Sequence, residues 1–334
     1  MSTCKVVGTL AKYAIPLNLV LILDDFGDIA LNLSIARSTL NGGDAKDAIY
    51  GLAAFGASHR LVRFAWGPAK AMRSVGVRMI DNVRDYKNSI FFVLITSLPF
   101  FAFMILASTT SFGGFVSGIR PETQTGIYLS QSLFYMSILP FIQAFCRLHE
   151  GLLLSFQLSH IVSFAAVMTL VGQIFSIVVL LYISNLPTKM IVPPMALYFG
   201  FFCKILVLLY GTYFHAWEQL KSNSVNLRQT SDTREESEGE NEIRHTDTIL
   251  SASINAGLDT NLCKRFVVLL KFWAPLGATQ LFQTVSRPFI NYLVATSKHG
   301  EIGLAVLTLC FPVGHLHYGW VVSNFVTRAP TLVS

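Results

Sequence analysis

The chain is 334 residues long, and 52% of its residues are hydrophobic while only 13% are charged. Soluble domains carry about 25% charged residues, so this composition excludes an ordinary soluble globular domain and indicates a polytopic membrane protein. The apolar runs are continuous and about 20 residues long rather than alternating at period two, which favours membrane helices over a β-barrel.

Eight apolar runs predict eight membrane helices. In chain order they cover 13–36, 47–68, 89–111, 125–147, 159–184, 192–216, 266–296 and 301–325. We therefore expect an all-α protein with a short N-terminus (1–12), a six-helix lobe (13–216), a polar linker (217–263) and the first two helices of a second lobe (264–334). The linker is rich in Ser, Glu, Asp and Asn and has almost no apolar surface to bury, which predicts a disordered segment.

Basic residues predict the orientation of the helices. They gather in the connection after the second run, with two more in the N-terminus and one between the fourth and fifth runs: Lys70, Arg73, Arg78, Arg84, Lys87, Lys5, Lys12 and Arg147. Cytosolic loops carry an excess of Lys and Arg, so the N-terminus and the linker are expected in the cytosol. The formal net charge of +6 then reflects this bias and gives no reason to expect a nucleic-acid partner.

Three acidic residues interrupt the first run, in the stretch LILDDFGDIALN. A charge at the bilayer centre costs about 2.5–3.5 kcal/mol even on insertion scales. The three acidic residues therefore cap a short helix, belong to a run that does not span the membrane, or form a functional site. Apolar sequence on both sides argues against the cap. Asp25, Asp28 and Asn32 are spaced i, i+3 and i+7 on one helical stripe, while Asp24 is offset by about 100°.

Two cations lie within later runs. Arg287, in QTVSRPFINYLV, has the planar fork that suits phosphate or carboxylate, and Pro288 removes a backbone donor beside it. A structural salt bridge is the alternative. Lys204, in FGFFCKILVLLYG, is interpreted either as a cavity-facing cation or as a packed or snorkelling side chain.

His59, Arg60 and Arg63 interrupt the second run. Arg63 is either an anchor at the cytosolic side or a collector of anions, and Arg60 is interpreted in the same way. His315 and His317 lie two residues apart, about 200° around a helix, so they are poorly placed to share a metal ion. His315 is expected to be a proton-sensitive cavity residue or a packed histidine. The five cysteines are scattered, and no Walker or G-x-S-x-G motif is present, so we expect no metal site, no cofactor and no enzyme.

An internal repeat relates the two ends of the chain. Residues 12–37 (KYAIPLNLVLILDDFGDIALNLSIAR) align at one constant offset with residues 271–296 (KFWAPLGATQLFQTVSRPFINYLVAT). The matches are Lys12 with Lys271, Pro16 with Pro275, Leu17 with Leu276 and Asn32 with Asn291. Chance similarity between apolar helices is the alternative explanation. As a parallel repeat, it predicts two lobes and places Asp28 at the position of Arg287.

Four segments carry a family resemblance: IPLNLVLILDDFGDIALN, FGASHRLVRFAWGP, SRPFINYLVA and FPVGHLHYGW. They resemble the progressive ankylosis protein family, a branch of the superfamily of multidrug-extrusion and lipid-flippase transporters. The resemblance implies a two-lobed, twelve-helix transporter with a central cavity, of which this chain has the first lobe and about two helices of the second. It also implies a multi-pass plasma-membrane protein that exports inorganic pyrophosphate, phosphate, ATP or citrate and so limits mineralisation.

The site residues follow from this resemblance and from the charges within the runs. We expect Arg287, Lys204, Arg63 and Arg60 to contact the anion, and Asp25, Asp28, Asn32, Asn291, His315 and His59 to serve as coupling or polar cavity residues. Two alternatives remain open. One is a truncated, non-transporting relative that assembles with or regulates a full-length transporter, and the other is a lipid flippase or drug exporter.

Overall fold

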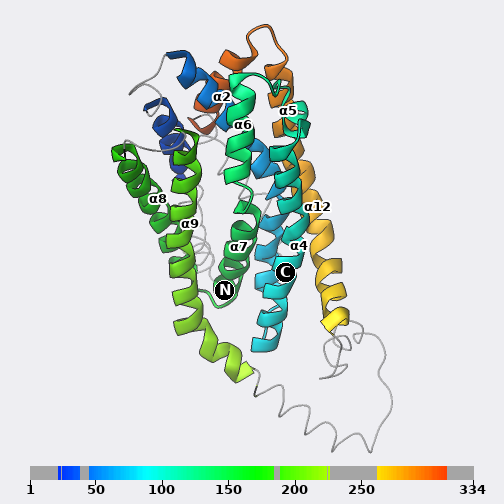
Figure 1. Cartoon of the computed structure of the whole chain (residues 1–334). Coiled ribbons are helices and arrows are strands. Elements are labelled where there is room, and N and C mark those ends of the chain that lie inside the picture. The colour runs from blue at the N-terminus through cyan, green and yellow to red at the C-terminus, as the bar shows by residue number, and fades with distance from the viewer. Residues whose placement is uncertain are drawn as a thin grey trace, which may run out of the picture.

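The computed structural model describes residues 22–23, 25–37, 45–183, 189–223, 225 and 262–313. These residues form a bundle of helices and contain no strand, which confirms the all-α prediction (Figure 1). After a first helix that includes residues 25–37, the elements are α2 (Ala45–Ala65), η1 (Pro68–Ala71), α3 (Met72–Arg78), α4 (Val83–Thr109), α5 (Phe112–Ser117), α6 (Gln124–Tyr135) and α7 (Leu139–Ser155). They continue with α8 (Ser159–Tyr182), η2 (Lys189–Ile191), α9 (Val192–Gly211), the π-helical η3 (Thr212–Ala216), α12 (Leu262–Ala295) and a helix over Gly300–Val313.

Three of the described helices are long and apolar enough to cross a membrane: Val83–Thr109, Ser159–Tyr182 and Val192–Asn223. They correspond to the third, fifth and sixth predicted runs. α6 and α7 pass the same test as a pair bent by 43°, and correspond to the fourth run. The last of the three helices continues to Asn223, beyond the predicted start of the linker at 217.

The fourth predicted run ends too early. It was expected to stop at 147, with Arg147 in a connection, but α7 continues to Ser155 and places Arg147 inside the helix. The reason is an ion pair of 2.7 Å between Arg147 and Glu150, one turn apart, which lets charged side chains remain in a buried helix. Arg147 is therefore a packing residue of the bundle and not part of a connection between helices.

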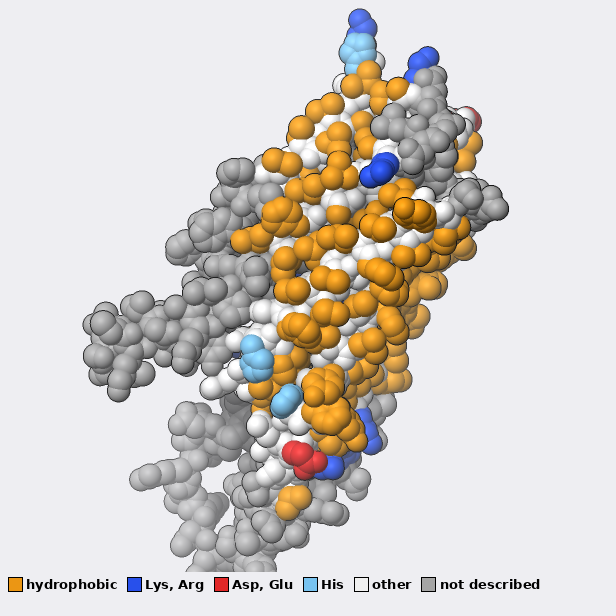
Figure 2. Space-filling model, turned by 90° about the vertical axis from the view of Figure 1, so that its left-hand side faces the viewer, with side chains coloured by type: hydrophobic (Ala, Val, Ile, Leu, Met, Phe, Trp, Pro, Cys, Tyr) orange, Lys and Arg blue, Asp and Glu red, His pale blue; other side chains and the backbone are white. Residues whose placement is uncertain are grey.

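Hydrophobic side chains cover the face that carries α8 and α9, and charged side chains gather toward the ends of the molecule (Figure 2). Large apolar residues on these two helices are widely exposed, among them Phe164, Phe175, Val178, Phe202 and Leu206. An apolar surface of this extent is typical of a protein surrounded by lipid tails. The polar side chains that function requires are accordingly expected inside the bundle.

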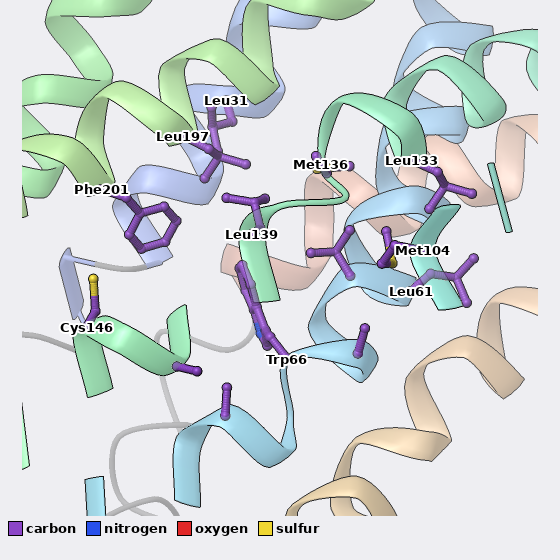
Figure 3. Packing of buried hydrophobic residues seen from close by; sticks show 14 of the residues in the cluster. Leu31, Leu61, Trp66, Met104, Leu133, Met136, Leu139, Cys146, Leu197 and Phe201 are labelled. Carbon is purple, nitrogen blue, oxygen red and sulfur yellow. The ribbon is translucent and has the colours of Figure 1, made fainter. Parts of the chain in front are cut away.

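The core lies between the first helix, α2, α6, α7 and α9 (Figure 3). Leu31 of the first helix, Trp66 directly after α2, Leu139 of α7, and Leu197 and Phe201 of α9 pack there. At one edge, α12 lies beside α4, with the Phe92 ring 5.1 Å from that of Phe266 and 5.9 Å from that of Trp273 (Figure 1). α12 thus packs against α4, a helix far earlier in the chain.

Candidate functional site

A small polar recess, partly open to the outside of the bundle, lies where the first helix, α2, α12 and the helix Gly300–Val313 meet. We call it the arginine recess. It is lined by Asp28, Asn32, Gly56, His59, Arg60, Arg63, Arg287, Thr308, Phe311 and Pro312. Its residues are far apart in the sequence, so the recess exists only because α12 and the helix Gly300–Val313 pack against the first helix and α2.

The spacing of residues along α2 determines which basic side chains face the recess. Arg60 and Arg63 lie one helical turn apart and face the same side, with His59 beside them. A glycine one turn earlier brings the partner helix close, because a Cβ atom at Gly56 would lie 1.7 Å from the Oγ1 atom of Thr308. The absence of a side chain at Gly56 therefore allows the Gly300–Val313 helix to cover this part of α2.

Asp28 supplies the carboxylate of the recess. It forms an ion pair with Arg63, and its Oδ1 atom lies 3.9 Å from Nε2 of His59. One turn further along, the Asn32 side chain donates a hydrogen bond of 2.9 Å to the carbonyl oxygen of Thr308. The stripe predicted for the first helix thus faces the recess at both Asp28 and Asn32.

Arg60 connects α2 to both later helices. Its guanidinium donates to Oδ1 of Asn291 on α12 and, over 3.2 Å, to the carbonyl oxygen of Leu307. The same guanidinium lies 4.9 Å from the centre of the Phe311 ring, and that of Arg287 lies 5.4 Å from it. One aromatic ring therefore holds two cations near each other through cation–π contacts, in spite of their like charges.

Among the described residues that line the recess, three arginines and one aspartate carry a formal charge of +2. Arginine is always protonated, so this surplus persists at physiological pH. A surplus of cations with forked donors around an open space is the chemical environment that binds phosphate and carboxylate groups.

Lys204 lies elsewhere, in a second group of charges that we call the Glu150 cluster: Arg73, Arg147, Glu150 and Lys204. Lys204 on α9 binds Oε1 of Glu150 at 2.7 Å, and Arg147 binds Oε2 at the same distance. Arg73 on α3 also binds Oε2, with its Nε atom at 3.1 Å. The Glu150 side chain is fully buried and that of Lys204 is 2% exposed.

A family model described as progressive ankylosis protein matches residues 2–235 and 241–330, which is most of the chain. The chain belongs to the progressive ankylosis protein (ANKH) family. The resemblance seen in the sequence is thereby confirmed.

Solved structures identify the fold of this ANKH-family chain. An inward-facing multidrug resistance MATE family transporter of the MOP superfamily matches 88% of it, with a TM-score of 0.55 and 18% identity. A MATE protein in complex with MaL6 matches 94% of it, with a TM-score of 0.52 and 15% identity. The matches cover 59% and 61% of those two proteins, so the chain spans about three fifths of their length. At these identities the likeness establishes the MATE-like fold, as predicted.

The structure brings together most of the predicted site residues of this ANKH-family chain. Those that line the recess or bind a residue that does are Arg287, Arg63, Arg60, Asp28, Asn32, Asn291 and His59. Asp25 is buried but is not among the lining residues, and Lys204 lies in the Glu150 cluster. Asp24, His315 and His317 lie outside the described residues.

Sequence reasoning missed Glu150 and the role of Arg73. The available signal was the segment RLHEG, which places a cation and an acid one turn apart directly after an apolar run. Among the described residues, no group of three or more His, Cys, Asp and Glu side chains could hold a metal ion.

Proposed function

We propose that this chain is a membrane transporter of small polyanions, with inorganic pyrophosphate as the representative substrate and phosphate, ATP and citrate as related ones. The observation that carries the proposal is the arginine recess, where Arg60, Arg63 and Arg287 surround an open space with Asp28 as the one carboxylate among the lining residues. The family and the MATE-like fold support a transporter. The cations that line the recess support an anionic cargo.

An ion pair within the recess offsets part of its positive charge. Asp28 binds Arg63, so the carboxylate partly neutralises the cations when no anion is present. An arriving pyrophosphate offers several oxygens that form bidentate bonds with guanidinium groups, and it competes with Asp28 for Arg63. Release then requires Asp28 to regain its partner. This exchange gives a cation-rich site a means of letting a tightly held anion leave.

The helices that form the recess also suit a rocking motion. Arg60 links α2 to Asn291 on α12 and to the carbonyl oxygen of Leu307, so one arginine bridges the first lobe and the later helices. In transporters built from repeated lobes, alternating access arises from movement of one lobe against the other around the substrate site. We place the protein in the plasma membrane with a cytosolic N-terminus, exporting pyrophosphate and thereby limiting mineral deposition outside the cell.

The test compares extracellular pyrophosphate and ATP from cells that express the chain or its Arg287→Ala variant, at matched surface levels. Loss of a charge-assisted contact is worth about 1.5–3 kcal/mol, so export by the variant should fall by at least tenfold. Arg120→Ala is the matched control, because Arg120 is exposed in the connection between α5 and α6 and should export normally. Undiminished export by Arg287→Ala would reject the assignment of the recess.

A further inference from the structure

Two polar atoms of the arginine recess have no hydrogen-bond partner among the described residues: Nε2 of His59 and Nε of Arg63. Both atoms are buried, and both side chains line the recess. The two residues are four positions apart on α2, so their side chains leave the same face of the helix. Because a buried polar atom without a partner costs free energy, this pair of atoms points to a polar group of a ligand that binds beside them.

The carboxylate of Asp28 lies next to both side chains and leaves both atoms unpaired. One of its oxygens lies 3.9 Å from Nε2 of His59, which is too far for a hydrogen bond. The other oxygen binds a terminal nitrogen of the Arg63 guanidinium, so the Nε–H group of Arg63 keeps its capacity to donate. An oxygen of a bound anion therefore meets a guanidinium donor and an imidazole nitrogen at this place in the recess.

The charges around His59 favour its neutral imidazole. Arg60 and Arg63 follow it on α2 and Arg287 lines the same recess from α12, and three positive charges disfavour a fourth. Asp28 on the first helix is the opposing charge, and it is already paired with Arg63. Arginine has donors only, whereas a neutral imidazole presents one nitrogen as an acceptor. His59 therefore adds an acceptor to a recess whose cations can only donate.

We propose that His59 makes the recess selective for oxyanions that still carry a proton, such as hydrogen phosphate and hydrogen pyrophosphate, over fully ionised ones such as sulfate. The inference rests on the proposed function and deepens it, since it names the form of the anion that the recess takes. A P–OH oxygen accepts a hydrogen bond from Nε of Arg63 and donates its own proton to Nε2 of His59, so it satisfies both atoms. A sulfate oxygen accepts from Arg63 in the same way but has no proton for His59.

The unpaired acceptor at His59 determines the size of the preference. Bound sulfate would leave Nε2 buried and without a donor, a cost that corresponds to about tenfold to a hundredfold in affinity. Sites built to hydrogen-bond a hydroxyl group reject analogues that lack it for the same reason. The arginines attract phosphate and sulfate alike, because both ions are tetrahedral and present several anionic oxygens. Without His59, the recess should therefore bind the two ions about equally.

Aromatic neighbours hold the His59 ring in this position. The Phe55 ring is stacked on it with the ring centres 5.3 Å apart, and the Trp66 ring lies 6.0 Å away, edge to face. Phe55 and Trp66 are themselves buried, so the imidazole is packed on two sides and Nε2 stays directed at Asp28 and the recess. The same packing makes phenylalanine a suitable replacement for His59, because it keeps the ring and removes the acceptor.

The experiment measures binding of radiolabelled pyrophosphate to the purified full chain in lipid nanodiscs, and its displacement by phosphate, sulfate or monofluorophosphate at a slightly alkaline pH. All three competitors are then mainly tetrahedral dianions, and phosphate is the one that carries a proton. Phosphate should displace pyrophosphate at a concentration about tenfold or more below that of either other ion. His59→Phe should abolish this difference, and His59→Gln, whose side-chain oxygen can accept in place of Nε2, should retain it. His160→Phe is the matched control, because His160 is an exposed residue of α8, and it should behave as the unsubstituted chain.

The outcomes separate this inference from the function on which it rests. Pyrophosphate binding that is lost in Arg287→Ala, with phosphate and sulfate displacing it equally from the unsubstituted chain, would overturn the selectivity and leave the recess standing. A preference for phosphate that persists in His59→Phe would assign the acceptor to Asp28 and overturn the role of His59. A preference that disappears in His59→Phe, with pyrophosphate binding kept in Arg287→Ala, would support His59 and reject the assignment of Arg287. Absence of pyrophosphate binding by the unsubstituted chain would overturn both proposals.

Discussion

Replacing Asp28 by asparagine should tighten anion binding in the arginine recess. Asp28 is paired with Arg63 and lies 3.9 Å from Nε2 of His59, and its side chain is only 12% exposed. Asparagine keeps the size of the side chain and removes its charge, so the formal charge of the four recess side chains rises from +2 to +3. The variant retains all three arginines while losing the group that competes for one of them.

The size of the effect follows from Coulomb's law. An anion oxygen on the far side of the Arg63 guanidinium would lie about 6 Å from the Asp28 carboxylate, where an effective dielectric of about 20 gives roughly 3 kcal/mol of repulsion per unit charge. Solvent in the open recess screens part of this energy. We therefore expect pyrophosphate to bind Asp28→Asn about ten- to a hundredfold more tightly, which is about 1.4–2.8 kcal/mol. Turnover should fall, because the carboxylate no longer helps to expel the anion.

Two measurements check this prediction: the dissociation constant for pyrophosphate in nanodiscs and the rate of pyrophosphate efflux from proteoliposomes. The matched control is Asp85→Asn, which removes an acid paired with an arginine, Arg265 at 2.8 Å, away from the recess. The control should leave the affinity unchanged. Equal or weaker binding by Asp28→Asn, at an unaltered melting temperature, would refute competition between Asp28 and the anion.

Two further substitutions test the packing around the charged groups. Gly151→Ala should destabilise the protein by about 1–3 kcal/mol, because the new Cβ atom would lie 2.1 Å from the carbonyl oxygen of Arg73; an unchanged melting temperature would contradict this close crossing. Arg60→Lys keeps the charge but cannot reach Asn291 and the carbonyl of Leu307 together, so about 2–3 kcal/mol of stability should be lost. Melting curves of the purified variant that coincide with those of the unsubstituted chain would show that Arg60 does not join the lobes.

Helical periodicity and the internal repeat predicted much of the recess. The i, i+3, i+7 stripe of the first helix placed Asp28 and Asn32 on one face, and both line the recess. The repeat aligned Asp28 with Arg287, and the two side chains indeed border the same space. The shared face of Asp28 and Asn32 could be predicted because local geometry fixes the face of a helix, whereas the equivalence of the two repeated segments and the roles of these residues stay predictions.

The partner of Lys204 could not be predicted from its neighbours in the sequence. Its central place in an apolar run indicated that the charge needs a partner inside the protein, and that part holds, since its side chain is buried. The partner, Glu150, lies on another helix 54 residues earlier and is reached only through the packing of α7 against α9. No spacing rule connects positions that far apart in the sequence, so the same lysine was equally compatible with the recess.

Arg147 illustrates a related ambiguity in counting basic residues. At the end of an apolar run, an arginine can be an anchor in the connection after the helix or a residue inside a helix that extends further. The acid one turn later decides between them, because a solvated anchor needs no carboxylate at i+3, while a buried arginine does. A carboxylate that is fully buried against Arg147, Arg73 and Lys204 also cannot be explained as part of a cytosolic loop. For membrane chains of this kind, acids beside basic residues at the ends of apolar runs are therefore the most informative place to look for charge clusters inside the protein.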